Sequence, residues 1–228
     1  LAMACENFDT VVVLLNANNA LELGFLVVVA YENVKACMWC GGVGQVGIYA
    51  IGDALAGNIN FSGHLADTYA YDSLSAPSSA NIGDFDILNS EVTNGTKYAV
   101  YAENIYVGYR YYETRYEDVV LDQGNAGDFD YASEVQFPFG FGLSYTEFEW
   151  SDYEVEEKAD TFEVSVKVTN TGDVAGKDVV EIYMQSPYTD YDKENGVEKA
   201  AVELVGFEKT GEIKAGDSET VKVSVPKE

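Results

Sequence analysis

The second half of the chain alternates apolar and polar residues with a period of two. Phe162, Val164, Val166 and Val168 are each followed by a polar residue. This alternation predicts a strand that buries one face. Similar patterns, with turn residues between them, predict further strands over residues 179–184, 201–207 and 220–225. Short alternating strands are typical of an antiparallel β-sandwich, which usually has about seven strands. Only five or six are indicated here, so one edge is expected to be missing or exposed.

The first part of the chain has continuous apolar runs instead. Thr10–Leu15 (TVVVLL) is apolar on both faces, which favours a central strand of a parallel sheet. Leu1–Asn7 is predicted to form the last turns of a helix, and Ala20–Phe25 a short helix near Gly24. Residues 25–31 and 34–39 are two more apolar runs, either of which could be a strand.

A glycine-rich turn follows these runs. Residues 41–47 (GGVGQVG) precede a helical apolar spacing that predicts a helix over about Gln45–Leu55. The turn has neither a Lys-Ser/Thr ending nor GxGxxG spacing, so it is interpreted as a plain strand-to-helix turn and not as a phosphate site. The order strand, helix, strand, helix indicates an α/β layer with a mostly parallel sheet.

The middle of the chain is harder to assign from its pattern. Asn58–Ser90 is predicted to be an extended ordered loop, Tyr98–Tyr112 an aromatic strand, and Glu117–Glu134 an acidic loop. The stretch Phe137–Trp150 (FPFGFGLSYTEFEW) is rich in glycine and aromatics, which is typical of a join between two packed units. We therefore predict two domains, residues 1–146 and 147–228, the second of which could be incomplete.

The chain is strongly acidic, with a formal net charge of -26. Such a surface repels phosphates and anionic lipids, so nucleic acid and membranes are excluded as expected partners. The start of the chain shows no basic region followed by an apolar core, and the three cysteines make a poor disulfide framework. These features favour a cytoplasmic over a secreted location. The chain also begins as though inside a helix, so it is expected to be a fragment of something longer.

For two small motifs, the residues alone leave more than one interpretation open. Cys37 and Cys40 form a CxxC, which is interpreted first as buried structural cysteines, then as a redox pair, then as part of a zinc site with Cys5 and His64. His64 lies near Asp67, but no G-x-S-x-G elbow positions a nucleophile, so a structural or solvent-facing histidine is expected. Neither a metal nor a cofactor is predicted.

Carboxylates near aromatic residues are the other candidate chemistry. Cleavage of a glycosidic bond needs two carboxyl groups on either side of it, and aromatic rings stack on sugars. The sequence alone does not pair any two of the candidates, which are Asp67, Asp72, Glu103, Glu113, Glu117 and Asp118.

Two segments have the character of sequence motifs: Gly44–Gly47 (GQVG) followed by Ala50–Gly57 (AIGDALAG), and Tyr106–Glu113 (YVGYRYYE). They resemble the GQxG…AIADxLxG helix and the YVGYRYYE motif of glycoside hydrolase family 3, the β-glucosidases and related exo-acting enzymes. The other similar segments are 7–24, 60–65, 137–150, 168–176 and 204–207. Their order is the family's order, and they cover nearly the whole chain.

The sequence departs from the family at four of these positions. Phe61 stands for the usual Pro, His64 for Arg, Val46 for a residue that is often Glu, and Asn104 for a common Gly. His64 and the DTYAYD of residues 67–72 resemble a bacterial branch of the family. The fold assignment is unaffected, whereas the tuning of the sugar site is open.

The resemblance implies a fold and an activity. The fold would be the C-terminal part of an α/β-sandwich domain, mostly a parallel sheet with helices, followed by an all-β fibronectin-III or immunoglobulin-like sandwich. In this family the nucleophilic Asp lies in a (β/α)₈ barrel, and the acid/base Glu lies upstream of the segment that matches Asn7. No catalytic residue is therefore assigned to this chain, and the barrel would belong to the same or another chain.

The resemblance further implies that the chain is the non-barrel portion of a retaining β-glycosidase acting on β-linked glucosides or oligosaccharides. It would brace the barrel and form one wall of the sugar pocket. The predicted wall residues are Tyr69, Asp72, Glu103 and Tyr109. The alternatives are a stand-alone carbohydrate-binding or structural module and a self-sufficient small glycosidase.

Overall fold

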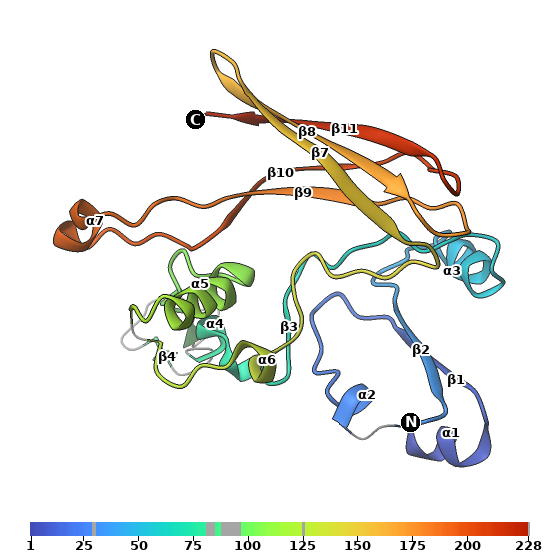
Figure 1. The fold of residues 1–228 in the computed structure, drawn as a ribbon. Coiled ribbons are helices and arrows are strands. Elements are labelled where there is room, and N and C mark those ends of the chain that lie inside the picture. The colour runs from blue at the N-terminus through green and yellow to red at the C-terminus, as the bar shows by residue number, and fades with distance from the viewer. Residues whose placement is uncertain (29–30, 81–84, 88–96, 125, 228) are drawn as a thin grey trace. The chain divides into compact units, whose positions relative to one another are not determined.

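A computed structural model describes residues 1–28, 31–80, 85–87, 97–124 and 126–227 (Figure 1). The chain forms two compact units, and each is assembled from three segments. Unit 1 comprises residues 1–39, 67–139 and 185–202. Unit 2 comprises residues 40–66, 140–184 and 203–228. One of the five places at which the chain passes between the units is Phe139 to Gly140, inside the stretch predicted to be a join, while the domain boundary after residue 146 stays a prediction.

Unit 1 begins with a helix, α1 (Ala2–Asn7), and a pair of parallel strands, β1 (Val11–Leu15) and β2 (Val34–Trp39). The helix, both strands and the parallel pairing are confirmed. The expected burial of β1 on both faces is wrong within the part of the chain that the structure describes. Val12 and Leu14 are each 44% exposed, because the sheet they belong to has two strands.

The predicted helix over Ala20–Phe25 is also wrong. Residues 20–23 are not helical, and α2 (Phe25–Val28) occupies part of the run that could have been a strand. Tertiary contacts explain the difference. Leu23 is 5% exposed and its carbonyl accepts a 2.8 Å hydrogen bond from Gln136, while the Glu22 carboxylate accepts bonds from the Ser73 amide and hydroxyl.

The rest of unit 1 consists of short elements around one longer helix, α5 (Tyr109–Val120). The aromatic strand predicted over Tyr98–Tyr112 is therefore wrong beyond Tyr98, and the acidic loop predicted from Glu117 begins inside the helix. The short elements are β3 (Tyr69–Ala70), η1 (Ser73–Ser75), α4 (Pro77–Ala80), β4 (Phe85–Asp86), β5 (Lys97–Tyr98), α6 (Tyr131–Glu134), β6 (Val135–Phe137) and α7 (Asp190–Asn195).

Tertiary packing decides the conformation of α5. Tyr112 is 3% exposed and forms a cluster with Ala70 and Val135. Tyr109, Tyr112 and Tyr116 are spaced so that they share one side of a helix. The helical spacing of these rings therefore outweighs the general preference of tyrosine for strands.

Among its described residues, unit 2 contains one helix, α3 (Ile48–Leu55), at the end of the predicted glycine-rich turn. The predicted helix over about Gln45–Leu55 is thus confirmed in its C-terminal part. Its expected apolar face is buried only at Ala54, whereas Val46 and Tyr49 are each 74% exposed.

The strands of unit 2 form two antiparallel sheets. Three strands, β7 (Phe148–Glu157), β8 (Thr161–Asn170) and β11 (Ser218–Pro226), are ordered β11-β8-β7. The second sheet pairs β9 (Val179–Met184) with β10 (Glu203–Lys209). The strands predicted over residues 161–169, 179–184, 201–207 and 220–225 are confirmed, with boundaries that differ by a few residues.

One apolar core lies between elements of these two sheets. Its buried members are Val164, Val166, Val168, Val180, Ile213, Val221, Val223 and Val225. Val168 is fully buried. Val164, Val166 and Val168 of β8 face this core, because side chains alternate between the two faces of a strand. The alternation in the sequence therefore indicates that β8 packs one of its two faces against the core.

Gly206 lets a strand of one sheet approach the other sheet closely. The register between β10 and β9 shifts between Leu204 and Gly206, and a Cβ atom at Gly206 would lie 2.7 Å from Val223 Cγ1. A side chain at this position would therefore require the Val223 side chain or one of the two strands to move.

Buried Asn170 closes one end of the core. Its side chain donates to the carbonyls of Val174 and Ile213 at 2.8 and 2.9 Å. Its Oδ1 accepts bonds from Thr146 Oγ1 at 2.6 Å and from the Gly172 amide at 3.1 Å. All four bonds hold loop segments, so this asparagine replaces backbone pairing where the strands end.

Candidate functional site

The four predicted pocket-wall residues all lie in unit 1, on two separate segments. Tyr69 and Asp72 belong to β3 and to the turn after it, Glu103 belongs to the loop that leads into α5, and Tyr109 is the first residue of that helix. No observation tests whether they bind sugar, so their role stays a prediction. Their surroundings show what each side chain does in this chain.

Tyr69 and Asp72 have structural contacts. Tyr69 is 3% exposed, and its ring meets that of Phe137 edge-on at 6.5 Å, because β3 and β6 pair these residues. Burial raises the pKa of the Tyr69 phenol, so the group stays protonated. Asp72 is exposed, and its Oδ1 accepts a 2.8 Å bond from the Leu74 amide, which caps η1.

Glu103 and Tyr109 lie on either side of a tight connection. Glu103 is 8% exposed, and its carbonyl accepts a 2.8 Å bond from the Tyr106 amide. Two positive φ angles follow, 51° at Asn104 and 58° at Gly108, where the helix begins. The Tyr109 ring packs on Phe139 at 4.8 Å between centroids.

Tyr112 connects the two predicted wall segments. Its hydroxyl lies 3.0 Å from Ser75 Oγ, and its ring packs in the cluster with Ala70 and Val135. Burial raises the pKa of this phenol too, although the bond to Ser75 opposes the shift. Sequence reasoning missed this residue, although its spacing of three from Tyr109 and four from Tyr116 was a helical signal.

Several of the candidate carboxylates hold the fold together. Glu113 accepts a 2.6 Å bond from the Tyr131 hydroxyl, and the burial of Tyr131 together with this bond raises the pKa of the phenol. Glu117 accepts a 2.7 Å bond from Gln185. Burial raises the pKa of Asp118, although Arg115 opposes the shift. Glu113 and Glu117 thus have structural partners, which weakens the case for a self-sufficient small glycosidase.

Residues 185–202, which connect β9 to β10 and belong to unit 1, form what we call the arm. The arm contains α7, and it bonds to α5 and to the loop before that helix. Sequence reasoning did not single out any residue of the arm. The one available signal was Asn104, which stands where the family commonly has Gly and donates a 2.8 Å bond to Glu198 of the arm.

The contacts described for the two small motifs do not indicate catalysis. No disulfide joins Cys5, Cys37 and Cys40, and desolvation raises the pKa of the Cys37 thiol, which disfavours a reactive thiolate. His64 Nε2 lies 3.8 Å from Asp178 Oδ1, so its acidic neighbour is not Asp67. Within the described ranges no group of three histidines, cysteines or carboxylates is placed to hold a metal ion.

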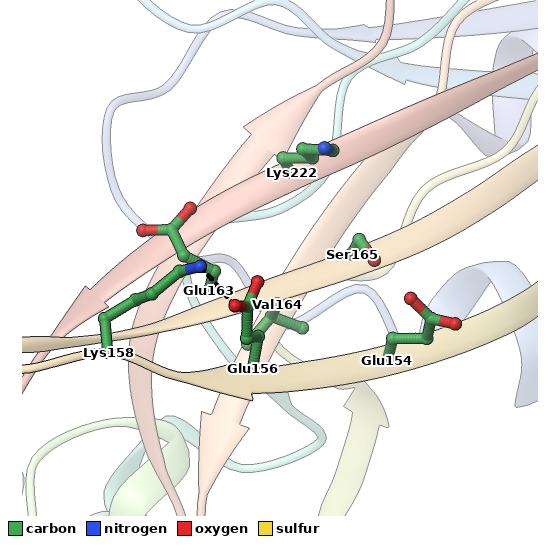
Figure 2. Close-up of a pocket in the computed structure, with 7 residues that line it drawn as sticks. All are labelled: Glu154, Glu156, Lys158, Glu163, Val164, Ser165 and Lys222. Atoms are coloured by element: carbon green, nitrogen blue, oxygen red, sulfur yellow. Dashed lines mark ion pairs between the residues drawn. The ribbon is translucent and has the colours of Figure 1, made fainter.

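A second candidate is a groove of about 300 Å³ on the three-stranded sheet of unit 2 (Figure 2). Most of its lining is charged, whereas ligand pockets are mainly apolar with a few polar groups. Glu156 lies directly opposite Glu163 in the register and pairs with Lys158. The lining residues are Glu154, Glu156, Lys158, Glu163, Val164, Ser165 and Lys222. The groove is therefore a charged surface feature of the sheet.

Among the residues that the structure describes, no helix has the length and apolar character needed to cross a lipid bilayer.

Comparisons with known proteins agree on one family. Residues 1–109 match the sequence model of the "Glycosyl hydrolase family 3 C-terminal domain". A β-glucosidase from Ruminococcus albus is 34% identical over 96% of this chain, which covers 19% of that protein. An exo-α-(1→6)-L-arabinopyranosidase from Bifidobacterium longum is 32% identical over 98% of this chain, which covers 25% of that protein.

A solved structure has the same fold. The β-glucosidase from Paenibacillus barengoltzii aligns with a TM-score of 0.76 and 32% identity, over 97% of this chain and 21% of that one. The present chain thus spans about a fifth to a quarter of the length of the relatives it matches.

Proposed function

Because the chain belongs to glycoside hydrolase family 3, we propose that it is the non-barrel part of a retaining β-glycosidase acting on β-linked glucosides or oligosaccharides. The observation that carries the proposal is the 34% identity to a β-glucosidase over 96% of this chain. The match extends through both compact units, so it is not confined to one motif.

The finer description of the fold belongs to this proposal. Residues 1–146 would be the C-terminal part of an α/β-sandwich domain, and residues 147–228 a fibronectin type III-like domain. The two antiparallel sheets and the valine core formed by β8, β9 and β11 support the second assignment. The parallel pair β1 and β2 supports the first.

The catalytic chemistry would come from a (β/α)₈ barrel in the same or another chain. A retaining enzyme holds two carboxyl groups about 5–5.5 Å apart, one as nucleophile and one as acid and base. This chain would supply neither group, but would brace the barrel and form a pocket wall with Tyr69, Asp72, Glu103 and Tyr109. The exposed apolar residues Val12 and Leu14 support a polypeptide partner for the sheet of unit 1.

A chimeric enzyme tests the proposal. The segment of the R. albus β-glucosidase that matches this chain is replaced by residues 1–228, and hydrolysis of p-nitrophenyl β-glucoside is measured. The matched control is the same enzyme with the segment deleted. We expect turnover by the chimera and none by the deletion. A folded chimera as inactive as the deletion would contradict the proposal.

Two further assays separate the alternatives and the sugar. Turnover by the 228-residue chain alone would favour the self-sufficient glycosidase, and loss of it in Asp72→Asn or Glu103→Gln would locate the carboxylates. Binding of glucose or cellobiose by the chain alone would favour the stand-alone module. Because the relatives carry different activity names, the chimera is also assayed with p-nitrophenyl α-L-arabinopyranoside.

A further inference from the structure

The arm makes three hydrogen bonds to the part of unit 1 that carries two of the predicted wall residues. Asn104 Nδ2 donates to Glu198 Oε2 at 2.8 Å. At the ends of the arm, Gln185 donates to Glu117 at 2.7 Å, and the Ala201 amide donates to Thr114 Oγ1 at 2.9 Å. The arm is thus attached to α5 at both ends and to the loop before α5 in between.

The arm is also stabilised by hydrogen bonds between its own residues. Asp192 is 4% exposed, and its carboxylate accepts bonds from the Thr189 amide and hydroxyl at 2.7 Å each. Lys199 donates a third bond at 2.8 Å. This capping box begins α7, and Gly196 ends it in the left-handed conformation. The bond to Lys199 closes the loop next to Glu198, so the Glu198 carboxylate is presented from a fixed segment.

Asn104 is suited to reach this carboxylate because of its backbone. Its φ of 51° is a left-handed conformation, which asparagine tolerates better than most residues. Glycine adopts the conformation freely but has no side chain to bond with Glu198. The asparagine therefore adds a contact that a glycine at this position would lack.

We propose that the arm is a positioning element of the sugar pocket, in which Asn104 and Glu198 fix the loop that carries Glu103 and leads to Tyr109, the first residue of α5. The inference rests on the proposed function, because it assigns these two residues a role in that pocket. Neither Asn104 nor Glu198 is assigned a contact with substrate. Each acts through the loop, so it is a positioning residue.

The expected effect is on binding and not on chemistry. A wall that contacts substrate equally in the ground state and the transition state changes KM and leaves kcat nearly unchanged. The bond between Asn104 and Glu198 is charge-assisted but exposed, so its loss is expected to raise KM about threefold.

The test uses Asn104→Gly, which removes the side chain and keeps a residue that favours positive φ. The matched control is Asp122→Gly, because Asp122 has a φ of 50° and lies outside the arm and the loop. Both changes are made in the chimera for kinetics and in the 228-residue chain for hydrogen exchange. Asn104→Gly should raise KM with kcat within about twofold, and should speed amide exchange in residues 185–202. Asp122→Gly should do neither.

Partner variants sharpen the test. Glu198→Gln retains an acceptor for Asn104 and should keep most of the parental KM, whereas Glu198→Ala should match Asn104→Gly. The double variant with Asn104→Gly and Glu198→Ala should be no worse than either single change, since all three lose the same bond.

Two results would overturn the inference. One is unchanged exchange of the arm in Asn104→Gly, and the other is an unchanged KM in an active chimera. An inactive parental chimera would instead contradict the proposed function. The exchange comparison would still decide in that case whether Asn104 ties the arm to the loop, because it needs no turnover.

Discussion

Strands β8 and β1 are both rich in valine, yet they are packed in opposite ways. In β8, Val164, Val166 and Val168 are 4%, 5% and 0% exposed. In β1, Val12 and Leu14 are each 44% exposed. The first strand alternates apolar and polar residues, and the second is apolar throughout.

The difference shows that the hydrophobic pattern along a strand indicates how many of its two faces must pack against other residues. An alternating strand needs one packed face, and β8 finds it within unit 2. A continuously apolar strand needs two packed faces. In the described part of unit 1, alternate residues of β1 are half-buried and the residues between them are exposed. Unit 2 is therefore a closed core, whereas the sheet of unit 1 is open.

The largest expected loss of stability comes from changing Asn170, which lies at one end of the valine core. Asn170→Ala removes four hydrogen bonds, one of them from the buried Thr146 hydroxyl, so the free energy of unfolding should fall by about 3 kcal/mol. Urea denaturation measures this change. Asn58→Ala, at an exposed asparagine, is the control and should change the value by less than about 0.5 kcal/mol. Equal losses would show that Asn170 does not close the core.

Two valines test the comparison directly. Val168→Ala removes buried methyl groups from the core and should lower the free energy of unfolding by about 2 kcal/mol. Val12→Ala makes the same chemical change on the open sheet and should cost under about 0.5 kcal/mol. Thermal and urea unfolding of the 228-residue chain give both values. Similar costs would contradict the distinction between closed and open regions.

Lowering the pH should change the structure of the arm before it changes the valine core. The bond from Lys199, with those from Thr189, lowers the pKa of Asp192 from 3.8 to about 2. A carboxyl whose pKa is lower in the folded state stabilises that state above pH 3.8 and loses the contribution as pH falls through about 2. Amide NMR signals of residues 189–199 should therefore shift in that window before those of β8. Asp192→Asn should abolish the step, and a step that persists would assign it to another group.

The smallest expected effect is on the outer face of β8. Glu163 lies directly opposite Glu156, so Glu163→Gln should relieve repulsion and stabilise the fold by about 0.5 kcal/mol. Glu154 lies opposite Ser165, and Glu154→Gln is the matched control with no expected gain (Figure 2). Urea denaturation at low salt and in 1 M NaCl measures both, and about 1 M salt should remove the gain. A gain in both variants would point to net charge instead of pairing.

The strands of unit 2 could be predicted because their alternation and turns are local signals. The parallel pair in unit 1 was also predictable, as a β-branched run followed by a second apolar run. Helix α5 was not, because its tyrosines suggested a strand and its helical conformation depends on Tyr112 packing against Ala70 and Val135. Residues 20–23 were misassigned for the same reason, since the bonds to Gln136 and Ser73 come from distant segments.

The candidate site shows the same limit more strongly. Motif similarity pointed to the loop before α5 and to residues 69–72, but not to what their side chains contact. Tyr69 is core in this chain, and Glu113 is bonded to Tyr131, which no spacing in the sequence indicated. The arm was missed because its partners are 68 to 94 residues away along the chain.

The absence of a side chain at Gly206 limits which substitutions the sequence can accept at that position. A methyl group there would lie 2.7 Å from Val223, inside the core that β10 and β11 share. A larger residue at position 206 should thus be accepted more readily when a smaller residue stands at 223. The two positions form a linked pair, and random libraries that vary both should recover Gly206→Ala mainly together with Val223→Ala or Val223→Gly.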